Sequence, residues 1–438
     1  MRAKHLYIET YGCQMNVNDS ERIAVMLAES GYVSVDKPEE ADLILVNTCS
    51  VRGGAEEKVY RRLENLRVFK RSKKHLLIGV GGCVAQQEGE ALQQRFHWLD
   101  IVFGTHNLHL LKDIVHDAEN GVHRCETAFL DNEKRLDLFP VLSGESRHSS
   151  FVTVMQGCDN FCSYCIVPYV RGREISRRSA EVIAEVRQLA SAGIQEVILL
   201  GQNVNSYGLK SPGEPSFAGL LKQVAEIDGI RRICFITSHP KDMSDELVSC
   251  FANMPKLAGQ IHLPAQSGSN SVLARMNRGY TREEYLRKIN ALKAARHGIA
   301  ITGDMIVGFP GETDEDFEQS LQLMQAVRYI DLFSFAYSVR PGTRAAEIGD
   351  DVPHEVKKAR LEKLQILQKQ ITRDVCNEFL GTIQSVLVEG EGKHPGQVCG
   401  KADNGRTVNF DGDSAMIGRF AQVKIIRVNR NSFLGEVV

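Results

Sequence analysis

The run Gln156-Gly-Cys-Asp-Asn-Phe-Cys-Ser-Tyr-Cys-Ile-Val-Pro168 places three cysteines, Cys158, Cys162 and Cys165, within eight residues. It follows the apolar stretch Phe151-Val-Thr-Val-Met155, which reads as a strand, so the cysteines are expected on the loop after it. Thiolates are the usual protein ligands of iron–sulfur clusters, and four of them normally complete the set. Three thiolates leave one iron open, and an open metal position is typical of a catalytic site.

Two simpler interpretations of these cysteines are a zinc knuckle and a set of buried free thiols. Structural zinc is held by four Cys or His ligands in a tetrahedron. The polar neighbours Asp159, Asn160 and Ser163 are poor candidates for a fourth ligand. The spacing therefore favours an iron–sulfur cluster over zinc.

The bulk composition bounds the class of protein. A chain of 438 residues is longer than one ordinary domain with a single hydrophobic core, so about two to four domains are expected. Its 43% apolar and 25% charged residues are typical of a globular protein, and its apolar runs, such as Leu43-Ile-Leu-Val46, are only of strand length. No membrane segment and no secretory signal are expected, so the predicted compartment is the cytoplasm.

The cysteine count and the net charge narrow the class further. Eleven cysteines in a reducing compartment indicate metal ligands or free thiols rather than disulfides. The net charge of −2 neither supports nor excludes a nucleic acid partner, so any such binding depends on local basic patches.

A second set of cysteines is spread over the first third of the chain, where strand and helix patterns alternate. Three predicted strands lead to one cysteine each: residues 5–10 to Cys13, residues 41–46 to Cys49 and residues 75–80 to Cys83. The spacings of 36 and 34 residues match about one βαβ unit each. Each cysteine is thus expected at the carboxyl end of a parallel strand, where open α/β sheets bind ligands.

A lone cysteine is often only a small buried apolar residue. Three cysteines at one structural position indicate instead that they converge on a single metal site, again with one open position. The remaining cysteines share no spacing with a partner and are interpreted as ordinary thiols: Cys125, Cys234, Cys250, Cys376 and Cys399.

From about residue 150 the alternation of strands and helices continues. The predicted strands are 151–156, 196–201, 232–237, 259–263, 300–307 and 332–338. The predicted helices are 179–192, 216–227, 243–252, 282–297 and 314–328. Thr281-x-x-Glu284 is a capping box for one of these helices. Six such units form an open sheet or a partial barrel, and both place the working residues on the loops after the strands.

Those loops are polar and rich in glycine. They are 201–208, Thr237-Ser-His-Pro240, 263–269 and 308–313. Each alone is a weak signal, because such sequences are common in turns. Together these loops are expected to line one end of the sheet or barrel, above the cysteine loop.

The spacing of apolar residues changes in the C-terminal tail. Residues 354–379 read as one charged helix, and then the pattern alternates with period two over 384–388, 406–410, 421–428 and 433–437. Four or five short strands predict a small barrel. Residues 414–435 contain no acid and carry Arg419, Lys424, Arg427 and Arg430. These cations predict an RNA-binding face, with a solvated strand face as the alternative.

The C-x3-C-x2-C spacing resembles the signature of the radical S-adenosylmethionine (SAM) enzymes, and the tail resembles a TRAM domain. The order of a three-cysteine α/β domain, a radical SAM core and a TRAM-like tail resembles the methylthiotransferases over essentially the whole chain. The resemblance implies three domains, at 1–125, 144–374 and 376–438. The fold class is α/β: an open parallel N-terminal domain, a partial (β/α)6 barrel and a small C-terminal β-barrel.

The resemblance implies two [4Fe-4S] clusters, each held by one set of three cysteines, and SAM on the open iron of the Cys158/Cys162/Cys165 cluster. Tyr164 is expected beside the SAM adenine, and Gln202 with Asn203 near its amino acid end. Ile306-Val-Gly308 resembles the family's adenine-side sequence, with its glutamate displaced by one position to Glu312. The implied catalytic residues are the cluster ligands alone.

Asn47-Thr-Cys-Ser-Val-Arg52, Gly201-Gln-Asn-Val-Asn205, Thr237-Ser-His-Pro240 and Val408-Asn-Phe410 most resemble the MiaB-type branch of that family. The tail departs from the family's pattern at Gly400-Lys-Ala-Asp403, where Gly-Arg-Thr is expected. This branch methylthiolates carbon 2 of N6-isopentenyladenosine next to the anticodon in tRNA. It does so in two SAM-dependent half-reactions, a methyl transfer to sulfur and then hydrogen abstraction by a 5′-deoxyadenosyl radical.

The implied partners are the tRNA anticodon stem-loop, an electron donor such as a flavodoxin or ferredoxin, and a sulfur donor. Arg171, Arg173 and Arg177, which follow the cysteine loop, are further candidates for contacts with RNA or for anchoring SAM, with a solvated helix start as the alternative. Two alternatives share the chemistry, acting on threonylcarbamoyl-adenosine in tRNA or on an aspartate of a ribosomal protein. An alternative of another class is a non-catalytic iron–sulfur RNA-binding protein.

Overall fold

The computed structural model describes residues 3–50, 55–130 and 148–438. Its contacts divide the chain into two compact units, which are described separately. The first comprises Met1–Ser143, Met155–Asp159 and Cys165–Arg177, and the second comprises Gly144–Val154, Asn160–Tyr164 and Arg178–Val438. The three predicted domains at 1–125, 144–374 and 376–438 stay a prediction.

The first unit is built on a six-stranded parallel sheet with the strand order β2-β1-β3-β4-β5-β6. The strands are β1 (Lys4–Thr10), β2 (Tyr32–Ser34), β3 (Leu43–Thr48), β4 (Leu77–Gly82), β5 (Ile101–Phe103) and β6 (Arg124–Glu126). The helices are α1 (Gln14–Ala28), α2 (Ala55–Ser72), α3 (Cys83–Glu88), α4 (Glu90–Arg95) and α5 (Leu111–Glu119), with the 3-10 turn η1 (Leu108–Leu110). The three strands predicted from sequence correspond to β1, β3 and β4.

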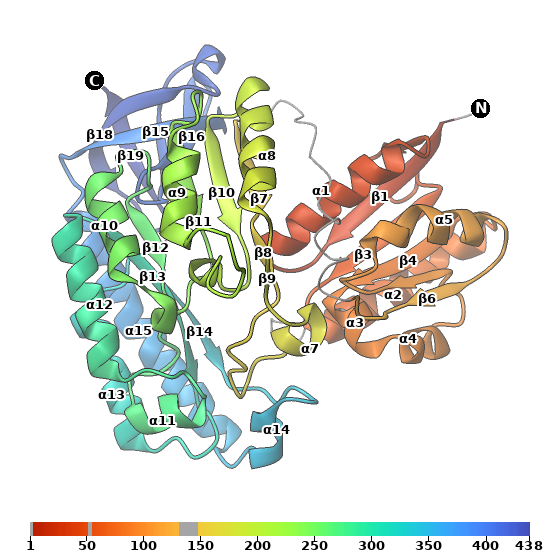
Figure 1. The fold of residues 1–438 in the computed structure, drawn as a ribbon, viewed down its shortest axis with the longest axis horizontal. Helices are drawn as coiled ribbons and strands as arrows, with labels where there is room; N and C mark the ends of the chain where they lie inside the picture. Colours follow the sequence, from red (N-terminus) through yellow and green to blue (C-terminus); the bar gives the residue numbers. More distant parts are fainter. Residues whose placement is uncertain (1–2, 51–54, 131–147) are drawn as a thin grey trace. The chain divides into compact units, whose positions relative to one another are not determined.

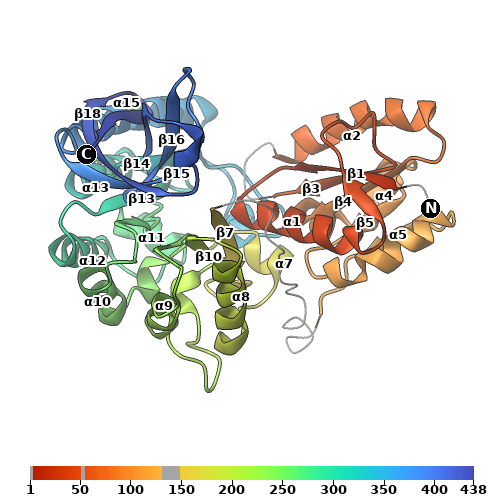
Figure 2. The same ribbon diagram turned by 90° about the horizontal axis from the view of Figure 1, so that it is seen from above.

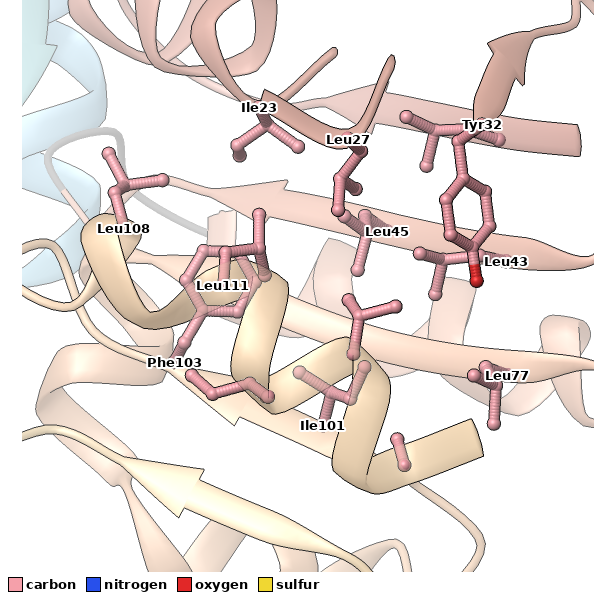
Figure 3. Packing of buried hydrophobic residues seen from close by; sticks show 14 residues of the cluster. Ile23, Leu27, Tyr32, Leu43, Leu45, Leu77, Ile101, Phe103, Leu108 and Leu111 are labelled. Carbon is pink, nitrogen blue, oxygen red and sulfur yellow. The ribbon is translucent and has the colours of Figure 1, made fainter. Parts of the chain in front are cut away.

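Helices cover both faces of this sheet because the central strands are apolar on both sides. All six residues of β3 are buried. Leu43 and Leu45 pack with α1 and α5, and Figure 3 shows Ile23, Leu27 and Leu111 meeting them on that face. Ile44 and Val46 turn to the other face, where Val59 and Leu63 of α2 pack. Burial on both faces is typical of parallel sheets in α/β proteins.

A short helix from the middle of the sequence also belongs to the first unit. It is α7 (Val167–Arg171), and the adjacent strands β8 (Met155–Gln156) and β9 (Ile175–Ser176) pair antiparallel beside it. The segment that follows Cys165 therefore packs as part of the N-terminal α/β unit.

The second unit contains six parallel strands in two groups of three, ordered β11-β10-β7 and β12-β13-β14. They are β7 (Ser149–Thr153), β10 (Glu196–Leu200), β11 (Arg232–Phe235), β12 (Gln260–His262), β13 (Ala300–Val307) and β14 (Asp331–Ala336). A parallel bridge between Ile233 and Leu257 joins the two groups into one partial barrel. The six strands predicted from sequence are thus confirmed, with bounds that differ by a few residues.

Helices alternate with these strands along the chain, as Figure 1 shows. They are α8 (Ser179–Ser191), α9 (Phe217–Ala225), α10 (Asp245–Asn253), α11 (Asn270–Arg275), α12 (Arg282–Ala295), α13 (Asp314–Val327), α14 (Arg344–Ile348) and α15 (His354–Asn377). The predicted capping box of α12 is confirmed, with Thr281 Oγ1 accepting from Glu284 N and Glu284 accepting from Thr281 N. A second capping box, Thr313 with Asp316, begins α13.

The C-terminal residues form a closed barrel with the order β15-β16-β17-β19-β18, coloured blue in Figure 2. The strands are β15 (Ile383–Glu391), β16 (Gln397–Ala402), β17 (Thr407–Asp411), β18 (Phe420–Val428) and β19 (Ser432–Val437). Four of them were predicted. β16 was missed, because its inward positions are Val398, Gly400 and Ala402, and small residues give a weak strand signal.

The barrel is hydrogen-bonded to the strands of the same unit. Asp403 accepts from the Gly259 amide at 3.0 Å and pairs with Arg296 at 2.7 Å. Arg406 donates to the Ile330 carbonyl at 2.6 Å. Asp403 and Arg406 therefore anchor the tail to the rest of the unit. Within the described residues no helix is both long and apolar enough to cross a bilayer.

Candidate metal centres

The three N-terminal cysteines follow three neighbouring parallel strands. Cys13 is the N-cap of α1, Cys49 comes directly after β3, and Cys83 is the first residue of α3 after β4. Since β1, β3 and β4 are adjacent and parallel, their carboxyl ends share one edge of the sheet. The thiols of Cys13 and Cys49 are within hydrogen-bonding reach of each other. The predicted placement of the cysteines at the strand ends is confirmed.

Two glycines allow the backbone to approach this edge closely. Gly12 has a φ of +137°, and a Cβ there would lie 2.5 Å from Cys49 Cβ. Gly82 has a φ of +89°, and its Cβ would lie 2.4 Å from the Thr48 carbonyl oxygen. A side chain at either position would push two of the cysteine-bearing turns apart.

An amide and hydroxyl network holds the three turns in register. Asn16 donates to the Thr48 carbonyl at 2.9 Å, and Asn47 donates to the Asn16 carbonyl at 2.9 Å. The Thr48 hydroxyl donates to the Gly81 carbonyl at 2.6 Å and accepts from the Val84 amide at 3.1 Å. The Asn47-Thr-Cys sequence thus connects all three cysteine positions.

The electrostatic environment favours at least one thiolate at this edge. The hydrogen bond with Cys49, together with the positive charge of Arg171, lowers the pKa of Cys13 to about 6 against the opposing effect of burial. Burial raises the pKa of Cys83, and Arg171 opposes that increase through its charge and a hydrogen bond. A cation beside several thiols matches the negative charge that metal-ligating thiolates carry.

The set formed by Cys158, Cys162 and Cys165 is divided between the two units. Cys158 lies in the first unit and donates its amide to the Gly172 carbonyl at 3.2 Å. Cys165 lies in the same unit, immediately before Ile166, which packs on Cys83. Cys162 lies in the second unit.

The surroundings of Cys162 within the second unit are unusual. Phe161, which precedes it, has a left-handed φ of +46°, and Asn277 donates to the Phe161 carbonyl at 3.0 Å. Nε2 of His239 lies 4.0 Å from Cys162 Sγ. Burial, and then the charge of Arg278, hold the pKa of His239 far below its usual value, so this imidazole is neutral. Left-handed non-glycine residues are uncommon and cluster at functional sites.

Arg278 is the main polar partner of Cys162. Its guanidinium donates to Cys162 Sγ at 3.3 Å, to the Tyr164 hydroxyl at 3.4 Å and to the Pro264 carbonyl at 2.7 Å. The residue is 4% exposed, and no carboxylate pairs with it among the residues that the structure describes. A buried cation is costly without a counter-charge. A cluster bearing anionic thiolates fits this position.

The predicted SAM contacts fall on the second unit. Tyr164 and Ile306 pack on the same apolar cluster, which contains Met276, Phe309 and Tyr337. Gln202 and Asn203 follow β10. Asn203 is buried and donates to Asp242 at 2.7 Å, and its Oδ1 has no hydrogen-bond partner in the described part of the chain. An unsatisfied buried acceptor of this kind suits a polar ligand group.

Glu312, the displaced glutamate of the family's adenine-side sequence, makes contacts with its own loop and with α15. It accepts from the Gly308 amide at 2.8 Å and pairs with Arg360 at 2.9 Å, in a buried setting. The displaced glutamate therefore holds the loop after β13.

Sequence reasoning missed a polar and aromatic face on strands β12 to β14. Ser334 of β14 hydrogen-bonds Gln365 of α15, so Phe333 and Phe335 lie on the face away from that helix. Their exposed fractions are 56% and 41%. The register places Phe333 beside Asp304 and Phe335 beside Ile306. The signal in the sequence is a pair of aromatics at alternate positions of a barrel strand.

His262 of β12 completes this face. Its Nδ1 lies 3.0 Å from the Thr302 hydroxyl, its Nε2 lies 3.5 Å from Asp304, and its ring meets Phe333 edge-on. We call His262, Asp304, Phe333 and Phe335 the inner-strand face. It combines an aromatic surface with a polar pair, which is a suitable surface for a planar heterocycle.

The predicted RNA contacts differ in exposure. Arg419, Lys424, Arg427 and Arg430 are all exposed on or beside β18 of the barrel. Arg173 is exposed and pairs with Asp159 at 2.7 Å. Arg171 and Arg177 are 3% and 2% exposed. Both guanidinium groups are thus buried, unlike that of Arg173, and the RNA contacts of all these cations stay a prediction.

In the described ranges no three His, Cys, Asp or Glu side chains form a group suited to one metal ion. In a four-iron cluster each thiolate binds its own iron atom, so the sulfurs do not need to converge on a single point.

Comparison with known proteins defines the class. Residues 5–104 match the uncharacterized protein family UPF0004, residues 152–324 the radical SAM superfamily and residues 378–438 the TRAM domain. This is a radical SAM protein with an N-terminal UPF0004 domain and a C-terminal TRAM domain.

Relatives over the full length define the family. The tRNA-2-methylthio-N(6)-dimethylallyladenosine synthase of Pelobacter propionicus is 66% identical over all of both chains. The protein of that name from Geobacter sulfurreducens is 61% identical over 99% of this chain and 98% of its own. The chain belongs to the family of tRNA-2-methylthio-N(6)-dimethylallyladenosine synthases.

Solved structures share the fold at low identity. A radical SAM methyltransferase from Kitasatospora setae, solved with cobalamin and a [4Fe-4S] cluster bound, has a TM-score of 0.59 at 14% identity, covering 91% of this chain and 81% of its own. A cobalamin-dependent SAM radical enzyme has a TM-score of 0.54 at 14% identity, covering 84% of this chain and 56% of its own.

Proposed function

We propose that the protein transfers a methylthio group to carbon 2 of N6-isopentenyladenosine next to the anticodon in tRNA. The observation that carries this proposal is the presence of two separate sets of three cysteines, each beside a buried arginine. The arginines are Arg171 at Cys13 and Cys83, and Arg278 at Cys162. Full-length similarity to synthases of that name supports the same substrate.

Cys13, Cys49 and Cys83 would hold one [4Fe-4S] cluster, and Cys158, Cys162 and Cys165 the other. When bound, the clusters and SAM supply the sulfur site, the methyl group, the electron and the hydrogen abstraction that the reaction needs. Arg278 offsets negative charge at Cys162, and Tyr164 with Ile306 offers an apolar wall to the adenine of SAM. Gln202 and Oδ1 of Asn203 would be available to its amino acid end.

The target adenosine would lie against the inner-strand face. Phe333 and Phe335 offer stacking surface, and His262 with Asp304 offers polar atoms to a base edge. Ile306 links this face to the Tyr164 cluster, because it pairs with Phe335 in the sheet and packs on that cluster. An adenosine stacked in the anticodon loop must be splayed out to reach such a surface.

We expect the prenyl group to control turnover. Burial of its five carbons contributes up to a few kcal/mol, at about 0.8 kcal/mol per CH2. The reconstituted protein with SAM and a strong reductant should therefore methylthiolate prenylated tRNA at least about tenfold faster, in kcat/KM, than unprenylated tRNA. Mass analysis of the nucleosides measures this. Equal rates on the two tRNAs would favour the threonylcarbamoyl substrate or a broader specificity.

Phe333→Ala and Phe335→Ala should raise KM for the prenylated tRNA. Base–aromatic stacking contributes about 1–3 kcal/mol per base, so a change of roughly five- to 150-fold is expected. Ile366→Ala is the matched control, because Ile366 is an exposed apolar residue on α15 of the same unit. If both phenylalanine variants match this control, the adenosine lies elsewhere.

The barrel should supply affinity for tRNA without taking part in the chemistry. Replacement of Arg419, Lys424, Arg427 and Arg430 by Gln should weaken tRNA binding and leave SAM cleavage unchanged. Each lost phosphate contact should reduce the slope of log affinity against log salt by a little under one unit. Point variants are preferable to truncation after Gly381, because the barrel is hydrogen-bonded to the strands through Asp403 and Arg406.

Lys369→Gln with Arg373→Gln is the control, because these two cations are exposed on α15. A quadruple barrel variant with the wild-type affinity and salt slope would show that the tail is not the RNA anchor. The exposed Arg173 would then become the better candidate.

We also propose a cytoplasmic location, with a flavodoxin or ferredoxin as electron donor and a separate sulfur donor.

A further inference from the structure

Arg171 reaches the N-terminal cysteines from α7, the helix that follows the radical SAM cysteines. Ile166 and Val170 pack on Cys83. The Thr105 hydroxyl donates to the Val170 carbonyl at 2.5 Å, and His106 hydrogen-bonds the Arg171 carbonyl at 3.1 Å. These contacts hold the end of α7 against the edge of the sheet where the cysteines lie.

The Arg171 side chain lies close to a carboxylate and to cysteine thiols. Its Nη2 donates to Asp19 Oδ2 at 2.8 Å, and its guanidinium hydrogen-bonds Cys83 and interacts with Cys13. Asp19 lies on α1, the helix that Cys13 caps. Both side chains of the ion pair are about 5% exposed.

We propose that the positive charge of Arg171 raises the reduction potential of the cluster at the Cys13/Cys49/Cys83 site. The inference rests on the proposed cluster at this site. One-electron reduction adds one unit of negative charge to a cluster, and a buried cation nearby stabilises the added charge because the low dielectric screens it little. Asp19 acts with the opposite sign.

A purely structural role for the Arg171–Asp19 pair has different consequences. If the pair only fastens α7 to the sheet, removing either partner loosens the same contact and admits water to the same site. Both substitutions would then move the potential in the same direction. If the charges act directly, Arg171→Gln and Asp19→Asn move it in opposite directions.

The experiment uses the full-length chain with Cys158, Cys162 and Cys165 replaced by alanine, reconstituted anaerobically with iron and sulfide, so that one cluster is read. We measure the iron bound per chain and the midpoint potential of the cluster. The potential comes from a redox titration monitored by electron paramagnetic resonance. We expect Arg171→Gln to make the potential more negative, Arg171→Lys to keep it near the parent value, and Asp19→Asn to make it less negative. Arg173→Gln is the control, since this exposed arginine lies two residues from Arg171. This variant should keep the iron content and the midpoint potential of the parent.

The outcomes separate the inference from the proposed function. A parent with about four irons whose potential is unchanged by Arg171→Gln, or shifted in the same direction by Arg171→Gln and Asp19→Asn, overturns the role of Arg171 alone. A parent that binds no cluster overturns the cluster assignment and the inference with it. If the Arg171→Gln variant binds no iron, the test rests on the Asp19→Asn variant. A midpoint potential of Asp19→Asn that is not less negative than that of the parent then overturns the inference.

Discussion

Alanine at Cys158, Cys162 and Cys165 is expected to abolish SAM cleavage, whereas alanine at Cys13, Cys49 and Cys83 should spare cleavage and eliminate the methylthiolated product. The reason is that the second set lies at the edge of the N-terminal sheet, with its own glycines, amide network and arginine. Release of 5′-deoxyadenosine measures the first activity, and mass analysis of tRNA nucleosides measures the second.

Metal content gives an independent check on the same variants. Each triple variant should retain roughly four irons where the parent binds roughly eight. Cys125→Ala with Cys399→Ala is the control, because these cysteines lie outside both sets, and it should keep full iron and both activities. Full iron content in the Cys13/Cys49/Cys83 variant would show that this set does not hold a cluster.

Replacement of Arg278 by methionine is expected to eliminate SAM cleavage and to destabilise the cluster-loaded protein by on the order of 3 kcal/mol. Methionine has similar length but cannot donate to Cys162 Sγ or to the buried Pro264 carbonyl. It also removes the only cation hydrogen-bonded to Cys162 among the described residues. Lysine should restore part of the activity, because it keeps the charge but not the planar fork.

The stability change is read from anaerobic denaturant unfolding of the reconstituted, cluster-loaded protein, and cleavage from 5′-deoxyadenosine release. Arg275→Met, three residues earlier, is the matched control. Arg275 pairs with Asp316 and is partly exposed, so a smaller loss of stability and normal cleavage are expected. An Arg278→Met protein that cleaves SAM at the parent rate would remove Arg278 from the site.

Much of the architecture follows from local pattern. The alternation of apolar strands with capped amphipathic helices predicted the N-terminal parallel sheet and, after about residue 150, an open sheet or a partial barrel. The resemblance to radical SAM enzymes favoured the partial barrel, and the period of two predicted the tail barrel. The position of Cys13, Cys49 and Cys83 just after three strands predicted that they share one sheet edge. These inferences succeed because strand direction and side-chain period are short-range properties, and parallel strands end at a common edge.

The roles of the arginines required the tertiary structure. In the sequence, Arg171 and Arg177 stand in a basic run with Arg173, and nothing local separates a buried guanidinium from an exposed one. Arg171 is distinguished by Asp19, which lies 152 residues away, and Arg278 by Cys162, which lies 116 residues away. Such pairings depend on which helix packs against which strand end. The sequence by itself therefore determined the fold class and the placement of Cys13, Cys49 and Cys83 at one edge of the sheet. Long-range packing decided which charges surround the thiols, because burial and Coulomb interaction depend on distance in space.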